Sequence, residues 1–181
     1  MEIQETRIPG LFILEDDNFS DSRGSFRRKY CVKDLKELLK ERNIVQVNQS
    51  DNILAGTIRG LHYQIEESKE IKIVSCVQGS ALDIAVDLRK GSKTFLQYES
   101  LLITAENHRS FFIPEGFAHG FQTLEDHTSL IYFTTQFYCP VNESGINYLE
   151  PSVGIKWNLP ASVLSLKDQQ IPLLNVNFKG I

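Results

Sequence analysis

The chain has 181 residues, enough to bury one substantial core, and no Pro/Gly/Ser-rich linker divides it, so we expect a single domain over residues 1–181. A net charge of −4 and a pI near 5.6 argue against bulk attraction to nucleic acid or to an anionic membrane, so any phosphate group must be bound locally. The polar N-terminus, the absence of an apolar run of about 20 residues and three scattered cysteines predict a cytoplasmic protein with reduced thiols.

The hydrophobic pattern is mostly that of β-strands. One helix is expected at residues 32–42, where Val32, Leu35, Leu38 and Leu39 recur on one face and charged residues fill the other. Alternation in steps of two predicts short strands at residues 10–14, 56–64, 71–78, 81–89, 95–103, 110–113, 117–124 and 129–137. We therefore predict an all-β antiparallel sandwich or barrel, on which a short helix or loop from about residue 159 onward packs.

Two central strands are separated by a turn at residues 78–80. In the first, residues 71–78, Lys72 falls on the same face as Val74 and Cys76. In the second, residues 81–89, the even-numbered apolar residues share one face, and Asp83 and Asp87 share the other. This second pattern is typical of a sheet with one face in solvent.

The run Arg59-Gly60-Leu61-His62-Tyr63-Gln64 contains a cation and a titratable imidazole close together. Strict alternation would place Arg59 and His62 on opposite faces. Either Gly60 marks a bulge that brings them together, or Arg59 acts from the rim of a pocket. A histidine in a strand is more often a satisfied core or rim residue than a catalyst, so the neighbours of His62 must decide its role.

Two further residues could join such a pocket. Lys72, between Ile71 and Ile73, lies either on a solvated face or in a barrel lumen, where its charge could stabilise an enolate oxygen. His119 follows a Pro114/Gly116 turn, and Gly120 beside it permits close approach of a ligand.

The sequence lacks the motifs that metal-dependent or nucleophilic catalysis, or a phosphate-binding loop, would require. The histidines are not clustered at metal-ligand spacing, no Gly-x-Ser-x-Gly elbow or glycine-rich phosphate loop is present, and no cysteine has an activating context. Proton transfer next to a carbonyl group is the chemistry that remains.

The chain resembles the dTDP-4-dehydrorhamnose 3,5-epimerases from about Pro9 to Pro172. The most specific part is RGLHYQ at residues 59–64 with FAHGF at residues 117–121. The other matching pieces are DSRG at 21–24 with Phe26, QVNQS at 46–50, Lys72, VDLR at 86–89, Tyr132, Tyr138 and LSLKD at 164–168. The resemblance implies a homodimeric, cupin-type β-sandwich (jelly roll) that uses no metal or other cofactor.

The resemblance also implies roles for individual residues. His62 would remove the protons next to the C4 ketone of a nucleotide-linked 4-keto-6-deoxyhexose, with Asp168 as its partner. Lys72 would stabilise the enolate, and Tyr132 would return a proton to the opposite face. Contacts to the dTDP-linked substrate would come from Arg23, Gln46, Asn48, Arg59, His119, Tyr138, Glu143 and Lys167.

The chain departs from the family pattern in two places. Ser25 replaces a phenylalanine and Arg28 a glutamate, which is expected to reverse a charge in the pocket wall. Residues 66–70 before Lys72 lack the usual glutamine.

Three alternatives remain open. A single-carbon epimerase, acting at C3 or C5 only, would use the same base and enolate site. A non-catalytic sugar-nucleotide-binding cupin would not need His62, Tyr132 and Asp168 together. A metal-dependent cupin would bind a transition metal.

Overall fold

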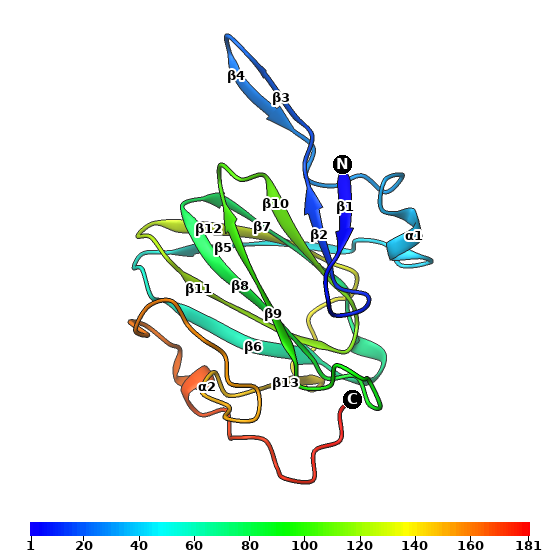
Figure 1. Ribbon diagram of the computed structural model, residues 1–181, viewed down its shortest axis with the longest axis vertical. Helices are drawn as coiled ribbons and strands as arrows, with labels where there is room; N and C mark the ends of the chain where they lie inside the picture. Colours follow the sequence, from blue (N-terminus) through cyan, green and yellow to red (C-terminus); the bar gives the residue numbers. More distant parts are fainter.

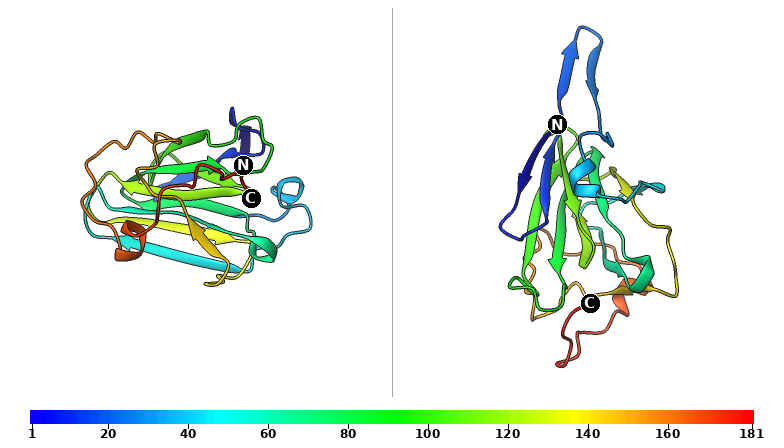
Figure 2. Two further views of the ribbon diagram at one scale, coloured as in Figure 1. Left: turned by 90° about the horizontal axis from the view of Figure 1, so that it is seen from below. Right: turned by 90° about the vertical axis from the view of Figure 1, so that its right-hand side faces the viewer.

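The computed structural model describes residues 1–181 and consists mainly of two antiparallel β-sheets that face each other (Figures 1 and 2). The six-stranded sheet has the order β1-β2-β10-β7-β12-β5, and the five-stranded sheet has the order β13-β6-β11-β8-β9. Strands β3 and β4 form a separate hairpin. The predicted antiparallel sandwich is confirmed.

The strand bounds agree with the alternation pattern to within a few residues. The six-stranded sheet contains β1 (Glu2–Glu5), β2 (Phe12–Glu15), β5 (Gln46–Asn52), β7 (Lys72–Gln78), β10 (Arg109–Ile113) and β12 (Thr128–Thr134). The five-stranded sheet contains β6 (Ile58–Gln64), β8 (Ser80–Asp87), β9 (Tyr98–Thr104), β11 (Phe117–Thr123) and β13 (Glu143–Gly145). The hairpin contains β3 (Asn18–Asp21) and β4 (Gly24–Arg27). The alternation pattern missed β1, β3, β4, β5 and β13, which are short, polar or both.

Three apolar clusters hold the fold together. The largest, with 13 buried residues that include Val74, Phe111 and Phe121, fills part of the space between the sheets. A second cluster covers the outer face of the five-stranded sheet, where Ile84 and Val86 pack against the C-terminal segment. The third combines strands of the six-stranded sheet with the helical segment around Leu35 and is smaller. Both sheets are therefore covered on their outer faces as well, at least in part.

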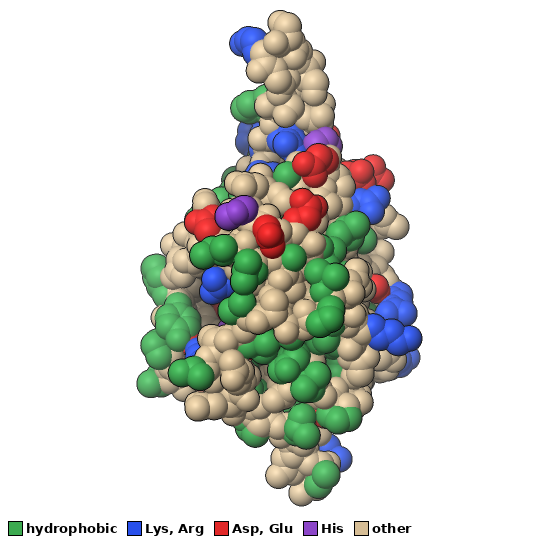
Figure 3. Space-filling model, turned by 90° about the vertical axis from the view of Figure 1, so that its left-hand side faces the viewer, with side chains coloured by type: hydrophobic (Ala, Val, Ile, Leu, Met, Phe, Trp, Pro, Cys, Tyr) green, Lys and Arg blue, Asp and Glu red, His purple; other side chains and the backbone are tan.

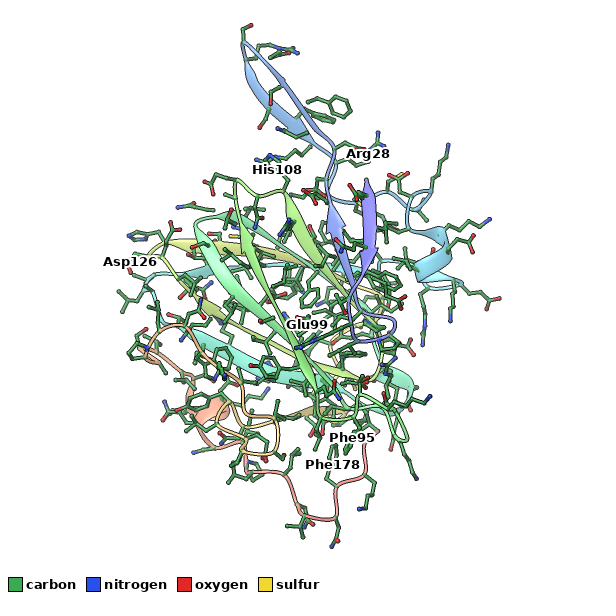
Figure 4. All side chains as sticks on the ribbon, viewed as in Figure 1. Arg28, Phe95, Glu99, His108, Asp126 and Phe178 are labelled. Carbon is green, nitrogen blue, oxygen red and sulfur yellow. The ribbon has the colours of Figure 1, made fainter.

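This outer covering corrects one expectation. Every residue of β8 is buried, so the strand has no solvent face, and Asp83 and Asp87 are completely buried. The strand has no solvent face because the C-terminal segment wraps the outside of the sheet and covers its apolar residues. Phe178 of this segment packs on Phe95, with ring centroids 6.0 Å apart (Figure 4). Asp83 points instead toward the interior of the sandwich, where β8 alternation also places Ala81 and Ala85.

The helices are shorter than predicted. Helix α1 spans only Lys36–Leu39, and it ends where Lys40 adopts a φ of 54°. The predicted apolar face is correct for Leu35 and Leu39, which are buried, whereas Val32 is 50% exposed. The other helical elements are η1 (Glu66–Ser68) and α2 (Leu166–Gln169), the latter within the predicted C-terminal helix or loop. None of these helices is long and apolar enough to cross a bilayer.

The β3–β4 hairpin projects away from the sandwich (Figures 1 and 3). Its two strands pair only with each other, with Phe19 opposite Phe26. These two rings are 65% and 67% exposed. At its base, the Lys29 ammonium lies 2.7 Å from the fully buried carboxylate of Asp16. An ion pair therefore anchors a hairpin whose apolar surface has no partner within this chain.

Asp87 at the end of β8 provides a test of the fold through its pH dependence. Arg89, Ser92 and Thr94 all donate hydrogen bonds to this carboxylate, at 2.6–3.0 Å. Burial opposes its ionisation, but these bonds outweigh burial and lower the pKa of Asp87 from 3.8 to about 2. At about 1.4 kcal/mol per pH unit, ionised Asp87 stabilises the native state by up to about 2.5 kcal/mol.

Asp87→Asn is therefore expected to lower the free energy of unfolding by about 2 kcal/mol at pH 7. Since the native pKa is depressed, this stabilisation is present above about pH 4 and is lost as the pH falls toward 2. Urea unfolding of both proteins between pH 7 and pH 3 measures the difference, with Asp34→Asn as the control. A difference that stays constant over this range would show that the carboxylate charge does not contribute.

Candidate active site

Two adjacent cavities open between the sheets, and each has a volume within the range of roughly 300–1,000 Å³ that is usual for ligand sites. We call the first, of about 380 Å³, the Arg59 cavity; it is lined by Thr57, Ile58, Arg59, His62, Lys72, His119, Phe121, Tyr132, Val163, Leu164, Ser165, Lys167 and Asp168. The second, of about 330 Å³, is the Tyr138 cavity; it is lined by Gln46, Asn48, His62, Tyr63, Gln64, Glu70, Lys72, Tyr132, Thr134, Tyr138 and Glu143. His62, Lys72 and Tyr132 line both, so the two cavities meet at these side chains. Figure 3 shows the body hollowed below the hairpin, with basic and hydrophobic side chains around the hollow.

The five-stranded sheet forms one wall through strand register. His62 on β6 lies opposite His119 on β11, and Arg59 lies opposite Phe121. Two steps along β11 thus correspond to three steps along β6. This is the bulge that alternation required to place Arg59 and His62 together. Gly60 permits it, because its φ is 109° and a Cβ there would lie 2.7 Å from the His119 carbonyl oxygen.

The six-stranded sheet forms the opposite wall. Lys72 on β7 lies opposite Thr134 on β12, and Tyr132 lies opposite both Val74 and Asn48 of the neighbouring strands. Directly opposed residues share a face, so Lys72, Tyr132 and Asn48 all point inward. The lumen alternative for Lys72 is the one that the structure adopts.

His62 and Asp168 form a hydrogen-bonded pair. The Nε2 atom of His62 lies 2.6 Å from the Asp168 carboxylate, which is 4% exposed and also accepts a bond from the Gly60 N–H. Burial opposes ionisation of Asp168, but the hydrogen bond and charge of His62 outweigh it and hold the pKa of Asp168 below its usual value. Since a carboxylate only accepts, we assign the proton to Nε2, which leaves Nδ1 with a free lone pair that can act as a base.

A second histidine–aspartate pair lies beside the first and was not predicted. His119 Nε2 is 2.7 Å from the Asp83 carboxylate, whose side chain is fully buried and whose second oxygen has no hydrogen-bond partner. Burial raises the pKa of Asp83, although the charges of His119 and Lys72 oppose this shift. The only sequence signal for this pair was the carboxylate of Asp83 within an otherwise apolar strand, and alternation instead favoured a solvent-exposed face for it.

The Tyr132 hydroxyl can act as a proton donor at neutral pH. Its side chain is largely buried, and burial raises the pKa of its hydroxyl. The charge of Glu70 raises this pKa further, while that of Arg59 lowers it. The hydroxyl is therefore neutral near pH 7 and carries a proton that it can give away.

The Tyr138 cavity has an ordered polar rim. The Tyr138 hydroxyl donates to Glu143 at 2.6 Å, and the Lys167 ammonium pairs with the same carboxylate oxygen. Burial opposes ionisation of Glu143, but these two bonds lower its pKa. Gln46 donates to Asn48 at 3.0 Å, so both amides are already oriented. The exposed Tyr138 ring offers a surface on which a flat base could stack.

Arg23 is the one predicted site residue that lines neither cavity. It lies at the tip of the β3–β4 hairpin, is 88% exposed and pairs with Asp21. Arg28 does not reverse a charge in a pocket wall within this chain, because it lies at the hairpin base, 4.0 Å from Asp34 (Figure 4). Ser25 is also on the projecting strand β4. All three residues are kept from the cavities by a hairpin that extends away from the sheets.

No group of three or more His, Cys, Asp or Glu side chains is placed to hold a metal ion. The two cavity histidines instead each face a carboxylate.

Comparison with known proteins identifies the family of the chain. The family model of dTDP-4-dehydrorhamnose 3,5-epimerase matches residues 5–176. The chain belongs to the dTDP-4-dehydrorhamnose 3,5-epimerase family. The enzyme of that name from Salmonella typhimurium is 40% identical over 179 residues, which cover 97% of this chain and 96% of the relative.

Solved structures of family members are also similar. The Legionella pneumophila enzyme, in complex with dTDP-4-keto-L-rhamnose, has a TM-score of 0.91 and 40% identity, covering 97% of this chain and 94% of that one. The Bacillus anthracis enzyme, with TDP and pyrophosphate bound, has a TM-score of 0.91 and 39% identity, covering 96% and 99%. This epimerase is thus a cupin-fold isomerase with dTDP-4-dehydrorhamnose 3,5-epimerase activity, an enzyme of dTDP-sugar metabolism in rhamnose biosynthesis.

Proposed function

We propose that this epimerase inverts C3 and C5 of dTDP-4-dehydro-6-deoxy-D-glucose by proton transfer between the two walls of the Arg59 cavity, without a metal or other cofactor. The observation that carries the proposal is the placement of His62 on one sheet and of Lys72 and Tyr132 on the facing sheet, all lining one cavity. A carbon is inverted only when its proton leaves one face and another arrives on the opposite face. Groups on facing walls meet this requirement.

Each proton transfer has a donor and an acceptor among the cavity residues and the substrate, and solvent then restores the residues. His62 Nδ1 takes the proton from the carbon next to the C4 ketone, and the C–H electron pair moves to the ketone oxygen to form an enolate. The Lys72 ammonium stabilises that oxyanion, and Asp168 stabilises the imidazolium. The Tyr132 hydroxyl then protonates the opposite face of the carbon, the ketone re-forms, and exchange with solvent restores Tyr132 and His62.

We assign the nucleotide part to the surrounding polar groups. Arg59, His119 and Lys167 supply cationic or hydrogen-bonding contacts to the sugar and diphosphate, and the Tyr138 ring stacks on the base. Glu143, Gln46 and Asn48 contribute further hydrogen bonds. Their position in cavities that meet at His62 supports this assignment.

Turnover in the presence of a chelator tests the proposal. The purified protein, dialysed against EDTA, is incubated with dTDP-4-dehydro-6-deoxy-D-glucose, and the product configuration is determined by proton NMR. We expect inversion at both C3 and C5 at a rate that EDTA does not change. Inversion at one carbon would indicate a single-carbon epimerase, and a rate restored only by added metal would contradict the cofactor-free mechanism.

We also propose that the enzyme is a homodimer in which the β3–β4 hairpin of one protomer reaches its partner. Two exposed phenylalanine rings on a hairpin that pairs with nothing else in the chain support this arrangement. In such a dimer Arg23 would reach a cavity of the partner subunit, whereas it lines neither cavity of its own chain. A cytoplasmic location remains a proposal as well, which three free cysteines support.

The double substitution Phe19→Ser/Phe26→Ser is expected to yield a monomer, because it removes the apolar surface that the hairpin would bury. Light scattering after size exclusion measures the mass, which we expect to be twice 20.6 kDa for the wild type and 20.6 kDa for the variant. Val176→Ser, at a residue that is 94% exposed on the C-terminal segment, is the matched control. A monomeric wild type, or a variant that stays dimeric, would contradict the proposal.

A further inference from the structure

Glu70 contributes a carboxylate to the active site that none of the assigned roles uses. It lies between η1 and β7 and lines the Tyr138 cavity together with His62, Lys72 and Tyr132. Its carboxylate oxygen is 3.1 Å from the Lys72 ammonium, and the two side chains are 11% and 16% exposed. It is the only carboxylate within 4.0 Å of that ammonium.

A mostly buried lysine such as Lys72 needs a carboxylate partner. Its four-carbon stem is flexible, and burial of its charge is costly unless an opposite charge lies nearby. The other groups around it do not provide this pairing: Arg59, His62 and His119 carry no negative charge, Asp83 is engaged by His119, and Tyr132 is a neutral donor. Glu70 is therefore the group that can fix where the ammonium points.

The backbone holds Glu70 in place. The next residue, Ile71, donates its N–H to the Thr135 hydroxyl at 2.9 Å and accepts a bond from the Thr135 N–H at 3.1 Å. The carboxylate thus starts from a fixed point beside β12. Glu70, Lys72, His119 and Gln64 also help to line a small cavity of about 10 Å³. This cavity has room for about one water molecule.

We propose that Glu70 is a positioning residue of the epimerisation: its carboxylate aims the Lys72 ammonium at the enolate oxygen. Glu70 acts through Lys72 and does not itself remove a proton. The inference rests on the roles proposed above for Lys72 and Tyr132. Since the charge of Glu70 also raises the pKa of the Tyr132 hydroxyl, loss of that charge is predicted to make the enzyme lose activity at a lower pH on the alkaline side.

Glu70→Gln removes the charge while keeping the shape and an acceptor oxygen. We expect kcat to fall about tenfold at neutral pH, less than the roughly 10²-fold that a full misplacement can cost, with KM changed less than about twofold. The alkaline limb of the kcat profile is expected to move down by about one pH unit, because the Tyr132 hydroxyl loses a nearby negative charge that raises its pKa. Glu70→Asp, which keeps the charge, is expected to retain the wild-type alkaline limb even if it turns over more slowly.

The control is Glu67→Gln, an exposed carboxylate on η1 that lines neither active-site cavity. An unchanged alkaline limb in Glu70→Gln, or a limb that moves equally in Glu70→Asp, would overturn the inference. Lys72→Ala, measured in the same series, separates this failure from failure of the proposed mechanism. If Lys72→Ala turned over like the wild type, the role of Lys72 itself would be wrong; if it lost activity while Glu70→Gln matched the wild type, only the role of Glu70 would be.

Discussion

Replacement of His62 by Ala is expected to lower turnover about 10³-fold and to abolish deuterium incorporation from solvent at both C3 and C5. The reason is geometric. His62 is the imidazole whose Nε2 is engaged by Asp168, so its Nδ1 is free to take a proton in the cavity that also contains Lys72 and Tyr132. His119, the other cavity histidine, is paired with the buried Asp83 on the same wall.

Loss of exchange has meaning only if the variant still folds and binds. His62→Ala is therefore expected to bind dTDP, measured by calorimetry, with an affinity within about threefold of the wild type, because the nucleotide contacts assigned above lie on other residues. His127→Asn is the matched control, since His127 is exposed and has a φ of 55°, a conformation that asparagine tolerates. Exchange that persists in His62→Ala would show that the base is another group.

Replacement of Tyr132 by Phe is expected to slow inversion about 10²-fold while deuterium exchange into recovered substrate slows much less. Removal of the hydroxyl leaves His62 and Lys72 in place, so the enolate can still form. Without a donor on the six-stranded sheet, the proton returns from His62 to the face that it left. The variant is thus expected to wash solvent deuterium into the substrate without inverting it.

Proton NMR in deuterated water measures both rates in one sample, from the loss of the C3 and C5 signals and from the appearance of product signals. Tyr30→Phe is the control, because Tyr30 stacks on Phe133 and lines neither cavity. Equal losses of exchange and inversion in Tyr132→Phe would remove the separate acid role of Tyr132.

Much of this architecture could be predicted because alternation reports directly on strands. Lys72 shares a face with Val74 and Cys76, and this face points into the sandwich. By contrast, alternation within β8 could not reveal that the C-terminal segment covers its outer face, and so Asp83 and Asp87 were wrongly assigned to solvent. What covers a strand depends on residues that are distant in sequence.

The active site, like the fold, could be predicted only in part from the sequence. A bulge at Gly60 was one of two possibilities from the sequence, and only strand register decides that Arg59 and His62 line one cavity. Pairing of Asp168 with His62, 106 residues apart, came from family resemblance and could not have been obtained from local pattern. In the sequence, Glu70 stands out only as part of a stretch that lacks the usual glutamine of the family. Its ion pair with Lys72 depends on the path of the chain between η1 and β7.

In the proposed mechanism, two groups on facing sheets exchange protons at carbons on both sides of one ketone. The most direct test is a time course of proton NMR in deuterated water, with the wild-type protein, dTDP-4-dehydro-6-deoxy-D-glucose and EDTA. We predict deuterium at both C3 and C5 of the product, with L-rhamno configuration and no other label. Product without deuterium at either carbon, or deuterium at only one of them, would contradict the claim.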